Sequence, residues 1–240
     1  MSPDEATLRE AANRLDLWTR FVNDRAARTV AEIGVYRGQF AARMLDDCPG
    51  IETYYMVDPW RNLEAWNKPA NKSDEVFEGF FREAMDRTGA HEAKRVVLRG
   101  TTTEVVGRVS DGSLDFAYVD GDHTLRGITV DLVSWWPKVR EGGWLGGDDF
   151  SPTIWQHDPA YEPTLVFPLA VHFAEAVGAR IYGLPHKQFL IEKTADSGHA
   201  FVDLTGRYGD LELKRQLERR PAEAPEPRGL RARLSERLRR

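Results

Sequence analysis

The sequence is poor in cysteine: Cys48 is the only one in 240 residues. A single cysteine excludes an internal disulfide bond, and Cys48 itself is expected to be inert. No apolar run approaches the roughly 20 residues that a membrane-spanning helix needs. Residues 1–10 carry acidic side chains and lack the apolar core of a signal peptide. These absences predict a cytoplasmic protein with no membrane span.

The body of the chain also lacks an excess of basic residues. The net charge is -5, and the last 30 residues alone hold ten Lys or Arg against five Glu, so the rest of the chain is strongly acidic. Phosphate binding needs a basic face, which argues against nucleic acid as a partner. Residues 206–240 are expected to form a helical, basic extension that includes the linker-like stretch 221–229.

Short apolar runs alternate with amphipathic stretches between residues 29 and 192, a pattern typical of an α/β fold. It predicts a doubly wound, mostly parallel sheet of seven strands between helices. The last two strands follow each other too closely for a helical crossover, so they are expected to form an antiparallel edge hairpin. Residues 1–28 are expected to be a helical cap, and residues 29–205 the main domain. The expected strands are 29–33, 53–57, 95–98, 114–119, 144–147, 180–184 and 188–192.

The clearest predicted helix follows the fourth strand. Its apolar residues, at 3-4-3-4 spacing from Leu125 to Val139, form one stripe that faces the sheet. Gly142 and Gly143 are expected to end it. Other helices are expected at residues 39–47, 73–88 and 165–177.

A glycine-rich turn follows the first predicted strand, where residues 32–38 read Glu-Ile-Gly-Val-Tyr-Arg-Gly. Gly34 allows a tight backbone turn and Gly38 opens the next helix, whose N-terminus favours a carboxylate. The spacing differs from the G-x-G-x-x-G of dinucleotide folds. Glu32 would face a pyrophosphate unfavourably but suits a ligand with an ammonium or sulfonium group. Asp58, at the end of the second strand, is placed to bond ribose hydroxyls.

The EIGVYRG turn followed by VDPW resembles the S-adenosylmethionine (SAM) binding motifs of class I methyltransferases. The stretch from VDGDH to GGDDF is similar to a bacterial branch of metal-dependent O-methyltransferases, which includes the macrocin-type sugar enzymes and, more distantly, the catechol and caffeoyl-CoA enzymes. The resemblance covers roughly residues 30–193. It implies a Rossmann-like methyltransferase domain with SAM as cosubstrate, held by Glu32, Gly34, Tyr36, Gly38, Asp58, Thr101, Thr102 and Asp120.

Acidic residues gather after two neighbouring strands, with Asp120 and Asp122 after the fourth and Asp148-Asp149 after the fifth. Carboxylates that cluster repel one another and need a cation or protons to coexist. Hard oxygen ligands suit Mg²⁺ or Mn²⁺. The resemblance implies that Asp120, Asp148 and Asp149 are the metal ligands, whereas Asp122 matches no ligand position and is expected to cap the next helix.

The resemblance also points to a catalytic base. Catechol-type relatives carry a lysine three residues after the first metal ligand, and here that position is His123. His123 or a carboxylate would take the proton of an acceptor hydroxyl that the metal polarises. The implied reaction is methylation of a hydroxyl on a sugar, a glycosylated natural product or a catechol-like phenol. Members of this family often form homodimers, so a homodimer is expected.

Two insertions, residues 60–72 and 151–163, mix aromatic and polar residues without periodicity, as lids often do. Their candidate substrate contacts are Trp66, Trp155, His157 and Tyr161. Three rival functions remain open. A nucleotide-sugar glycosyltransferase would use Asp120-Gly121-Asp122 to bind metal, and a SAM-binding scaffold would catalyse nothing. An NAD-linked dehydrogenase is disfavoured by the glycine spacing.

Overall fold

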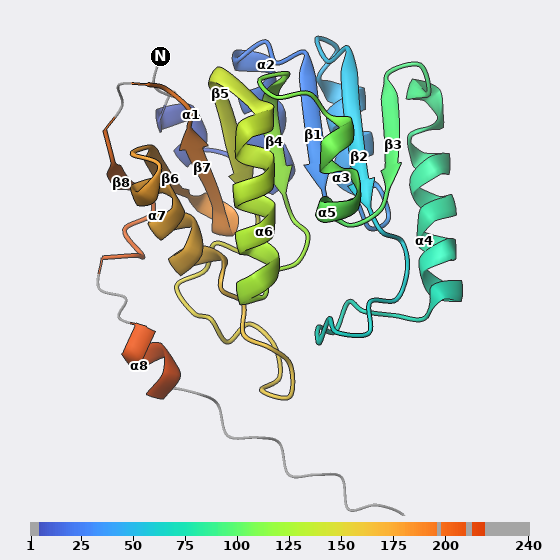
Figure 1. The fold of residues 1–240 in the computed structure, drawn as a ribbon. Helices are drawn as coiled ribbons and strands as arrows, with labels where there is room; N and C mark the ends of the chain where they lie inside the picture. Colours follow the sequence, from blue (N-terminus) through green and yellow to red (C-terminus); the bar gives the residue numbers. More distant parts are fainter. Residues whose placement is uncertain (1–4, 196–197, 210–212, 219–240) are drawn as a thin grey trace, which may run out of the picture.

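The computed structural model describes residues 5–195, 198–209 and 213–218. In these residues eight strands form one sheet in the order β3-β2-β1-β4-β5-β7-β6-β8 (Figure 1). The α/β class and the mostly parallel sheet are confirmed, but the strand count is eight because an unpredicted strand, β8, pairs with β6. The strands are β1 Thr29–Ile33, β2 Thr53–Asp58, β3 Arg95–Arg99, β4 Leu114–Val119, β5 Val139–Gly147, β6 Arg180–Leu184, β7 Gln188–Glu192 and β8 Ala200–Asp203.

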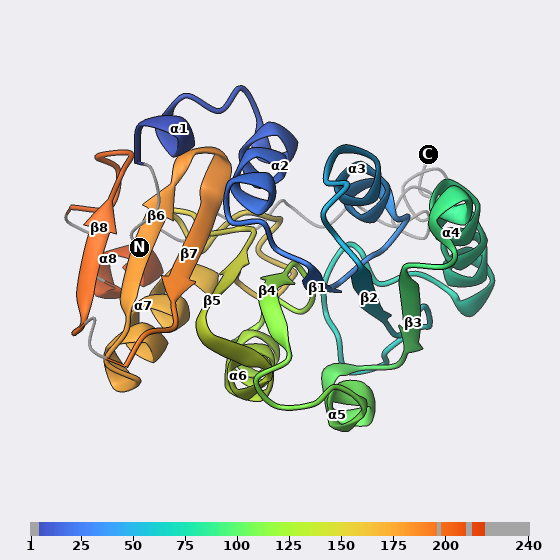
Figure 2. The same ribbon diagram turned by 90° about the horizontal axis from the view of Figure 1, so that it is seen from above.

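Helices cover both faces of the sheet. Helices α1 to α4 lie on one face and α5 to α7 on the other, which gives three layers (Figure 2). Each face buries its own apolar cluster between strands and helices. Among the described helices, none is both long and apolar enough to span a bilayer. The helices are α1 Glu5–Arg9, α2 Arg14–Asp24, α3 Gln39–Asp47, α4 Asp74–Arg87, α5 Thr102–Val105, α6 Leu125–Trp135, α7 Val166–Ala176 and α8 Leu213–Glu218.

The N-terminal segment contains two described helices where the sequence predicted one. The Asn13 side chain accepts a hydrogen bond from the Asp16 backbone N–H and so caps the start of α2. Trp18, on the next turn, has no exposed surface and packs against Phe116 and Tyr118 of β4. The α2 helix is therefore part of the layer that covers the sheet.

The helix after β4 is shorter than predicted. It ends at Trp135, and a 3₁₀ turn over Trp136–Lys138 separates it from β5. Pro137 has no N–H to continue the α-helical ladder, which explains the early end. The β5 strand then begins at Val139, five residues before the predicted start.

The predicted hairpin of β6 and β7 is confirmed as antiparallel. It does not form the edge of the sheet, because β7 pairs with β5 and β8 lies outside β6. Of the predicted basic extension, residues 206–209 and the α8 helix are described, and the rest lies outside the described residues. Tyr208 packs against Phe150 and Phe167 in the core, so the packed body extends past residue 205.

Strand register determines where the site forms. The pairing aligns Val57, Ile33, Val119 and Gly147 across β2, β1, β4 and β5. The next residue of each strand therefore reaches the same carboxyl-terminal rim: Asp58, Gly34, Asp120 and Asp148. The loops that follow the strands extend beyond this rim (Figure 1).

Replacing Trp18 with Ala is expected to lower the free energy of unfolding by about 3–5 kcal/mol, because it leaves a large cavity against β4. Trp18→Phe keeps most of the ring volume but removes the indole N–H, so we expect a loss of about 1–2 kcal/mol. Urea unfolding measures both. Val133→Ala, at an exposed position of α6, is the control and should change stability by less than about 0.5 kcal/mol. Equal effects at Trp18 and Val133 would contradict the packing of Trp18 against β4.

Candidate active site

The glycine turn after β1 packs directly against the end of β4. Gly34 has a φ of 95°, and a Cβ at this position would lie 2.1 Å from the Asp120 carbonyl oxygen. Gly38, with a φ of 72°, caps α3, and a Cβ there would lie 2.8 Å from Ala84 Cα of α4. Both positions therefore need glycine for the backbone angle and for packing. The space beside Gly38 is filled by α4.

Two buried acids flank this turn. The Glu32 carboxylate accepts a hydrogen bond of 2.8 Å from the Tyr54 hydroxyl. Burial, together with the charges of Asp120 and Asp58, raises the pKa of Glu32 well above its ordinary value. Burial also raises the pKa of Asp58, although its carboxylate accepts backbone N–H bonds from Tyr36 and Trp60. The turn thus brings together acids whose ionised forms a bound cation would stabilise.

The remaining predicted SAM contacts lie near this turn or at the end of β3. Tyr36 uses both backbone groups within the protein, since its N–H bonds Asp58 and its carbonyl accepts from Trp60 Nε1. Thr101 caps α5 in a capping box with Glu104. Thr102 is buried and donates to Asp131 on α6 at 2.5 Å. Their roles toward SAM stay predictions.

An arginine lies between the predicted metal ligands of β4 and β5. Arg14 Nη1 donates to Asp120 Oδ2 at 3.1 Å and also bonds Asp148 Oδ2. The other oxygen of Asp148 accepts from Gln188 Nε2 at 2.6 Å and from the Asp149 backbone N–H at 2.7 Å. Burial and the charge of Asp148 raise the pKa of Asp120 to about 7. The strands bring these acids together as predicted, and Arg14 partly neutralises them.

His123 forms an ion pair with the third acid. Its Nδ1 lies 2.7 Å from Asp149 Oδ2, and its Nε2 lies 3.6 Å from Asp120 Oδ1. The buried Nε2 has no hydrogen-bond partner. Burial alone would lower the pKa of His123, but the hydrogen bond to Asp149 and the surrounding carboxylates outweigh it and raise the pKa. The same hydrogen bond lowers the pKa of Asp149 despite its burial.

The rim as it stands does not fit a divalent metal. Mg²⁺ requires several oxygen ligands at about 2.0–2.1 Å around one point. Here Asp120 and Asp148 face Arg14, while Asp149 faces His123. No group of three His, Cys, Asp or Glu side chains in the described part of the chain is arranged to hold a metal ion. The ligand set Asp120, Asp148 and Asp149 therefore stays a prediction, and no reaction step is derived through a metal.

Asp122 is not the helix cap that the sequence predicted. Thr124 is the cap of α6, because its side chain accepts from the Gly127 N–H. Asp122 Oδ1 instead accepts from the Thr124 N–H and from Trp66 Nε1, each at 3.0 Å. Asp122 thus connects the first insertion to the start of α6.

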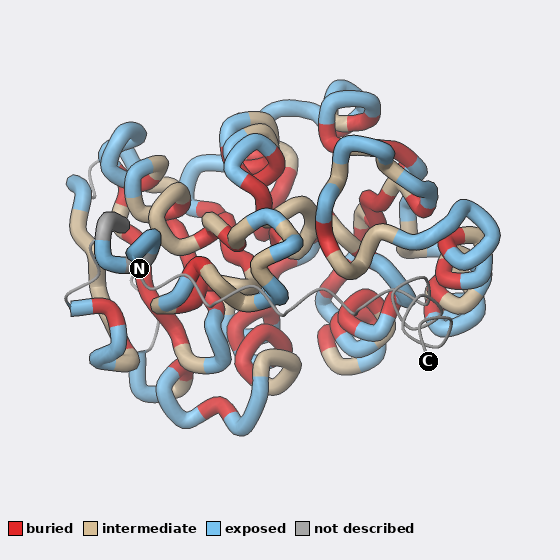
Figure 3. Tube along the Cα trace, turned by 90° about the horizontal axis from the view of Figure 1, so that it is seen from below, coloured by how far each residue is buried: buried red, intermediate tan, exposed pale blue. Residues whose placement is uncertain are grey.

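The two insertions join into one cover at the rim, and Figure 3 looks onto this side of the molecule. Lys68 Nζ donates to the carbonyls of Glu162 and Pro163 at 2.8 and 3.0 Å, and Asn67 Nδ2 donates to the Ala160 carbonyl at 3.0 Å. The Leu165 N–H, just after the second insertion, bonds the His123 carbonyl at 2.9 Å, so the C-terminal end of this insertion is held next to the site.

The four predicted substrate contacts all belong to this cover. Trp66, Trp155 and Tyr161 are half-buried, and His157 is exposed. Burial and the charge of Lys68 lower the pKa of His157. His123 acts in the same direction, and Asp149 acts in the opposite one. Contact of these four residues with a substrate stays a prediction.

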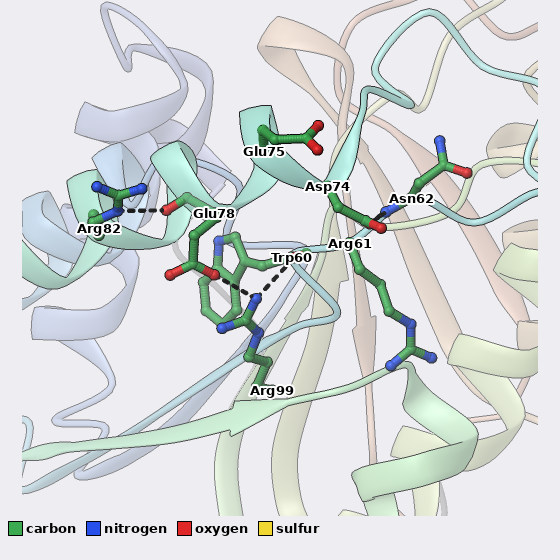
Figure 4. A pocket seen from close by; sticks show the side chains of 8 residues that line it. All are labelled: Trp60, Arg61, Asn62, Asp74, Glu75, Glu78, Arg82 and Arg99. Carbon is green, nitrogen blue, oxygen red and sulfur yellow. Dashed lines mark hydrogen bonds and ion pairs between the residues drawn. The ribbon is translucent and has the colours of Figure 1, made fainter.

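A cavity of about 480 Å³ opens beside the glycine turn, between the segment after β2 and α4 (Figure 4). Its walls are mostly charged, and Arg99 crosses it to bond Glu78 at 2.8 Å and the Trp60 carbonyl at 3.2 Å. Trp60 connects the cavity to the turn through its indole bond to Tyr36. The cavity lies next to the predicted SAM contacts. Its lining residues are Trp60, Arg61, Asn62, Asp74, Glu75, Glu78, Arg82 and Arg99.

A family model described as a methyltransferase domain matches residues 31–150, which is half of the chain. The chain belongs to this methyltransferase family. The class I methyltransferase resemblance of the sequence is thereby confirmed. The glycosyltransferase and dehydrogenase alternatives are not retained. No curated protein matches the sequence significantly.

Solved structures share the fold of this methyltransferase at low sequence identity. A candidate caffeoyl-CoA O-methyltransferase from Staphylococcus aureus is 15% identical with a TM-score of 0.57, over 80% of this chain and 93% of that one. The O-methyltransferase TomG from Streptomyces achromogenes, in complex with SAM, is 16% identical with a TM-score of 0.53, over 78% and 82%. The SAH-bound Podospora anserina methyltransferase PaMTH1 is 14% identical with a TM-score of 0.55, over 75% and 78%.

Three polar residues at the rim of this methyltransferase or in its cover were not predicted from the sequence. Arg14 stands four residues before Trp18, so helical spacing places both on one face of α2, but no motif marks it. Gln188 is a buried polar residue at the start of the apolar strand β7. Lys68 lies in an insertion without periodicity. Tertiary contacts alone reveal their roles.

The buried carboxyl of Asp131 predicts a pH-dependent stability for the methyltransferase. Its buried carboxyl accepts hydrogen bonds from Thr102 and the Asp122 backbone, and burial raises its pKa from 3.8 to about 7. Because the pKa of Asp131 is higher in the folded state than in the unfolded state, its protonation stabilises the fold. This contribution is fully present below pH 3.8 and is lost as the pH rises through about 7. The asparagine of Asp131→Asn cannot ionise. The free energy of unfolding of this variant, relative to that of the parent, should therefore rise by on the order of 2 kcal/mol between pH 5 and 8.

Urea unfolding at several pH values measures this gain. Asp86→Asn, at an exposed position of α4, is the control and should follow the parent at every pH. Parallel stability curves for Asp131→Asn and the parent would show that Asp131 is ionised in the fold at all these pH values.

Proposed function

We propose that this methyltransferase transfers the methyl group of SAM to a hydroxyl oxygen of a small molecule. The carrying observation is the His123–Asp149 pair, whose imidazole presents a buried, unpartnered Nε2 beside Asp120 at the rim of a methyltransferase fold. The O-methyltransferase descriptions of two structures with the same fold support oxygen as the acceptor atom. The acidic rim supports a cationic cosubstrate.

SAM supplies an electrophilic methyl group on a sulfonium centre. Glu32 and Asp120 lie where its cationic groups would bind. Burial raises the pKa of both acids, and a bound cation would stabilise their ionised forms, so each acid favours a cationic ligand. Asp58 keeps lone pairs for ribose hydroxyls beside the bonds it accepts from the backbone. Gly34, Tyr36, Gly38, Thr101 and Thr102 complete the proposed site.

His123 is the proposed base. Asp149 holds Nδ1, which fixes the orientation of the ring and leaves Nε2 to accept the proton of the acceptor hydroxyl as its oxygen forms the new bond to the methyl carbon. The electron pair of the broken carbon–sulfur bond stays on sulfur. The cover formed by the two insertions excludes water and positions the acceptor, with Trp66, Trp155, His157 and Tyr161 as its proposed walls.

The acceptor class follows the sequence resemblance: a sugar, a glycosylated natural product or a catechol-like phenol. Use of Mg²⁺ or Mn²⁺ remains a prediction that is separate from this mechanism. Assembly as a homodimer and a cytoplasmic location also remain predictions.

Calorimetric titration with SAM tests the cosubstrate. We expect Asp58→Asn to weaken SAM binding roughly tenfold or more, because it removes a charged acceptor. Glu75→Gln, in the neighbouring cavity on α4, should leave the affinity unchanged. The opposite pattern would place SAM in that cavity, and an absence of SAM binding would refute the proposed function.

His123→Gln is expected to lower kcat by about 10²–10⁴-fold while SAM binds normally, since the base is lost and the cosubstrate contacts remain. Because the pKa of His123 is raised, activity of the parent should fall as the pH drops through a value above the ordinary 6.5. The assay follows methyl incorporation by mass across a library of hydroxyl acceptors.

His172→Gln, on the exposed surface of α7, is the matched control and should behave as the parent. If His123→Gln keeps both the rate and the acidic limb of the pH profile, a carboxylate is the base. If no acceptor is methylated by the parent although SAM binds, the chain is a SAM-binding scaffold.

A further inference from the structure

Every carboxylate of the rim already has a partner from the protein. One nitrogen of Arg14 bonds both Asp120 and Asp148, and the second oxygen of Asp148 accepts from Gln188 and the Asp149 backbone. The remaining acid, Asp149, pairs with His123. The guanidinium of Arg14 is thus the cation that bridges the ends of β4 and β5.

Arg14 is held in this position by the packing of its own helix. It occupies the first turn of α2, and Trp18, one turn later on the same face, has no exposed surface. The Trp18 indole donates to Gln188 at 2.7 Å, and Gln188 donates to Asp148 at 2.6 Å. A closed ring of contacts therefore runs from Arg14 through Asp148 and Gln188 to Trp18 and back along one helical turn.

We propose that Arg14 is the built-in cation of this acidic rim, and that Arg14 and a divalent metal exclude one another there. A metal held by Asp120 and Asp148 would compete with the Arg14 guanidinium for the space between the two carboxylates, and the two positive charges would repel each other at short range. The proposal rests on the ion-pair geometry and does not depend on which acceptor is methylated.

Exchange of the two cations would need only a side-chain movement. The Arg14 side chain is 38% exposed although its helix is anchored by Trp18, so the guanidinium has a path to solvent with α2 in place. Removal of the guanidinium should therefore free the carboxylates without dismantling the rim. The freed acids would then regain the repulsion that a cation relieves.

Titration of Mn²⁺ into the full chain, followed by calorimetry and by the electron paramagnetic resonance signal of free Mn²⁺, tests the proposal. We expect Arg14→Met to bind Mn²⁺ about tenfold or more tightly than the parent, since it removes a competing positive charge. Arg14→Lys, which keeps the charge, should stay close to the parent. Arg20→Met, on the same helix and paired with Asp16, is the matched control.

Two results would overturn the proposal: equal Mn²⁺ affinity of the parent and Arg14→Met, or no Mn²⁺ binding by a folded Arg14→Met. Thermal unfolding establishes that each variant is folded. If Arg14→Met does not fold, Arg14→Gln, which also removes the positive charge, takes its place in the same titration with the same two overturning results. SAM titration of the same proteins tests the proposed function separately. If the parent does not bind SAM, methyl transfer is refuted, but the Mn²⁺ result still decides the role of Arg14.

Discussion

One buried amide connects the N-terminal helix to the reactive end of the sheet. Gln188 accepts from the Trp18 indole and the Tyr118 hydroxyl, and it donates to Asp148 and to the His186 carbonyl. A buried side-chain amide with all of these bonds made is rigid, and leaving any of them unmade would be costly. The orientation of Asp148, the seating of α2 and therefore the position of Arg14 all depend on this residue.

The charges of the rim follow from that arrangement. Parallel register forces the residues after β4 and β5 to the same edge, so Asp120 and Asp148 meet whether or not a ligand is bound. Their repulsion is offset within the protein by Arg14 from α2, while His123 offsets Asp149. A cationic cosubstrate would therefore enter a site in which some of the acids are already neutralised. Glu32 and Asp58, which flank the glycine turn, are not bonded to an arginine in the described part of the chain.

The sequence predicted what depends on local pattern and strand order. Seven of the eight strands, the glycine turn and the meeting of the acids after β4 and β5 all follow from apolar periodicity and from the rule that parallel strands end at one edge. The sequence did not predict β8, because all four residues of this strand are half-buried and show no alternation between buried and exposed positions. It also extended the helix after β4 across Pro137, because the apolar stripe continues through the 3₁₀ turn into the next strand.

The largest gap concerns the partners of the acids. A carboxylate cluster in a sequence indicates that some cation must be near, but it does not say whether the cation is a metal or a side chain from a distant segment. Arg14 lies 106 residues before Asp120 and in no recognised motif, so only tertiary structure places its guanidinium between the two strands. The same argument applies to Lys68, which bonds residues 94 and 95 positions later in the chain and so joins the two insertions into one cover. Residues that complete a charge balance or join loops across the fold carry no local signature, whereas residues that shape a turn do.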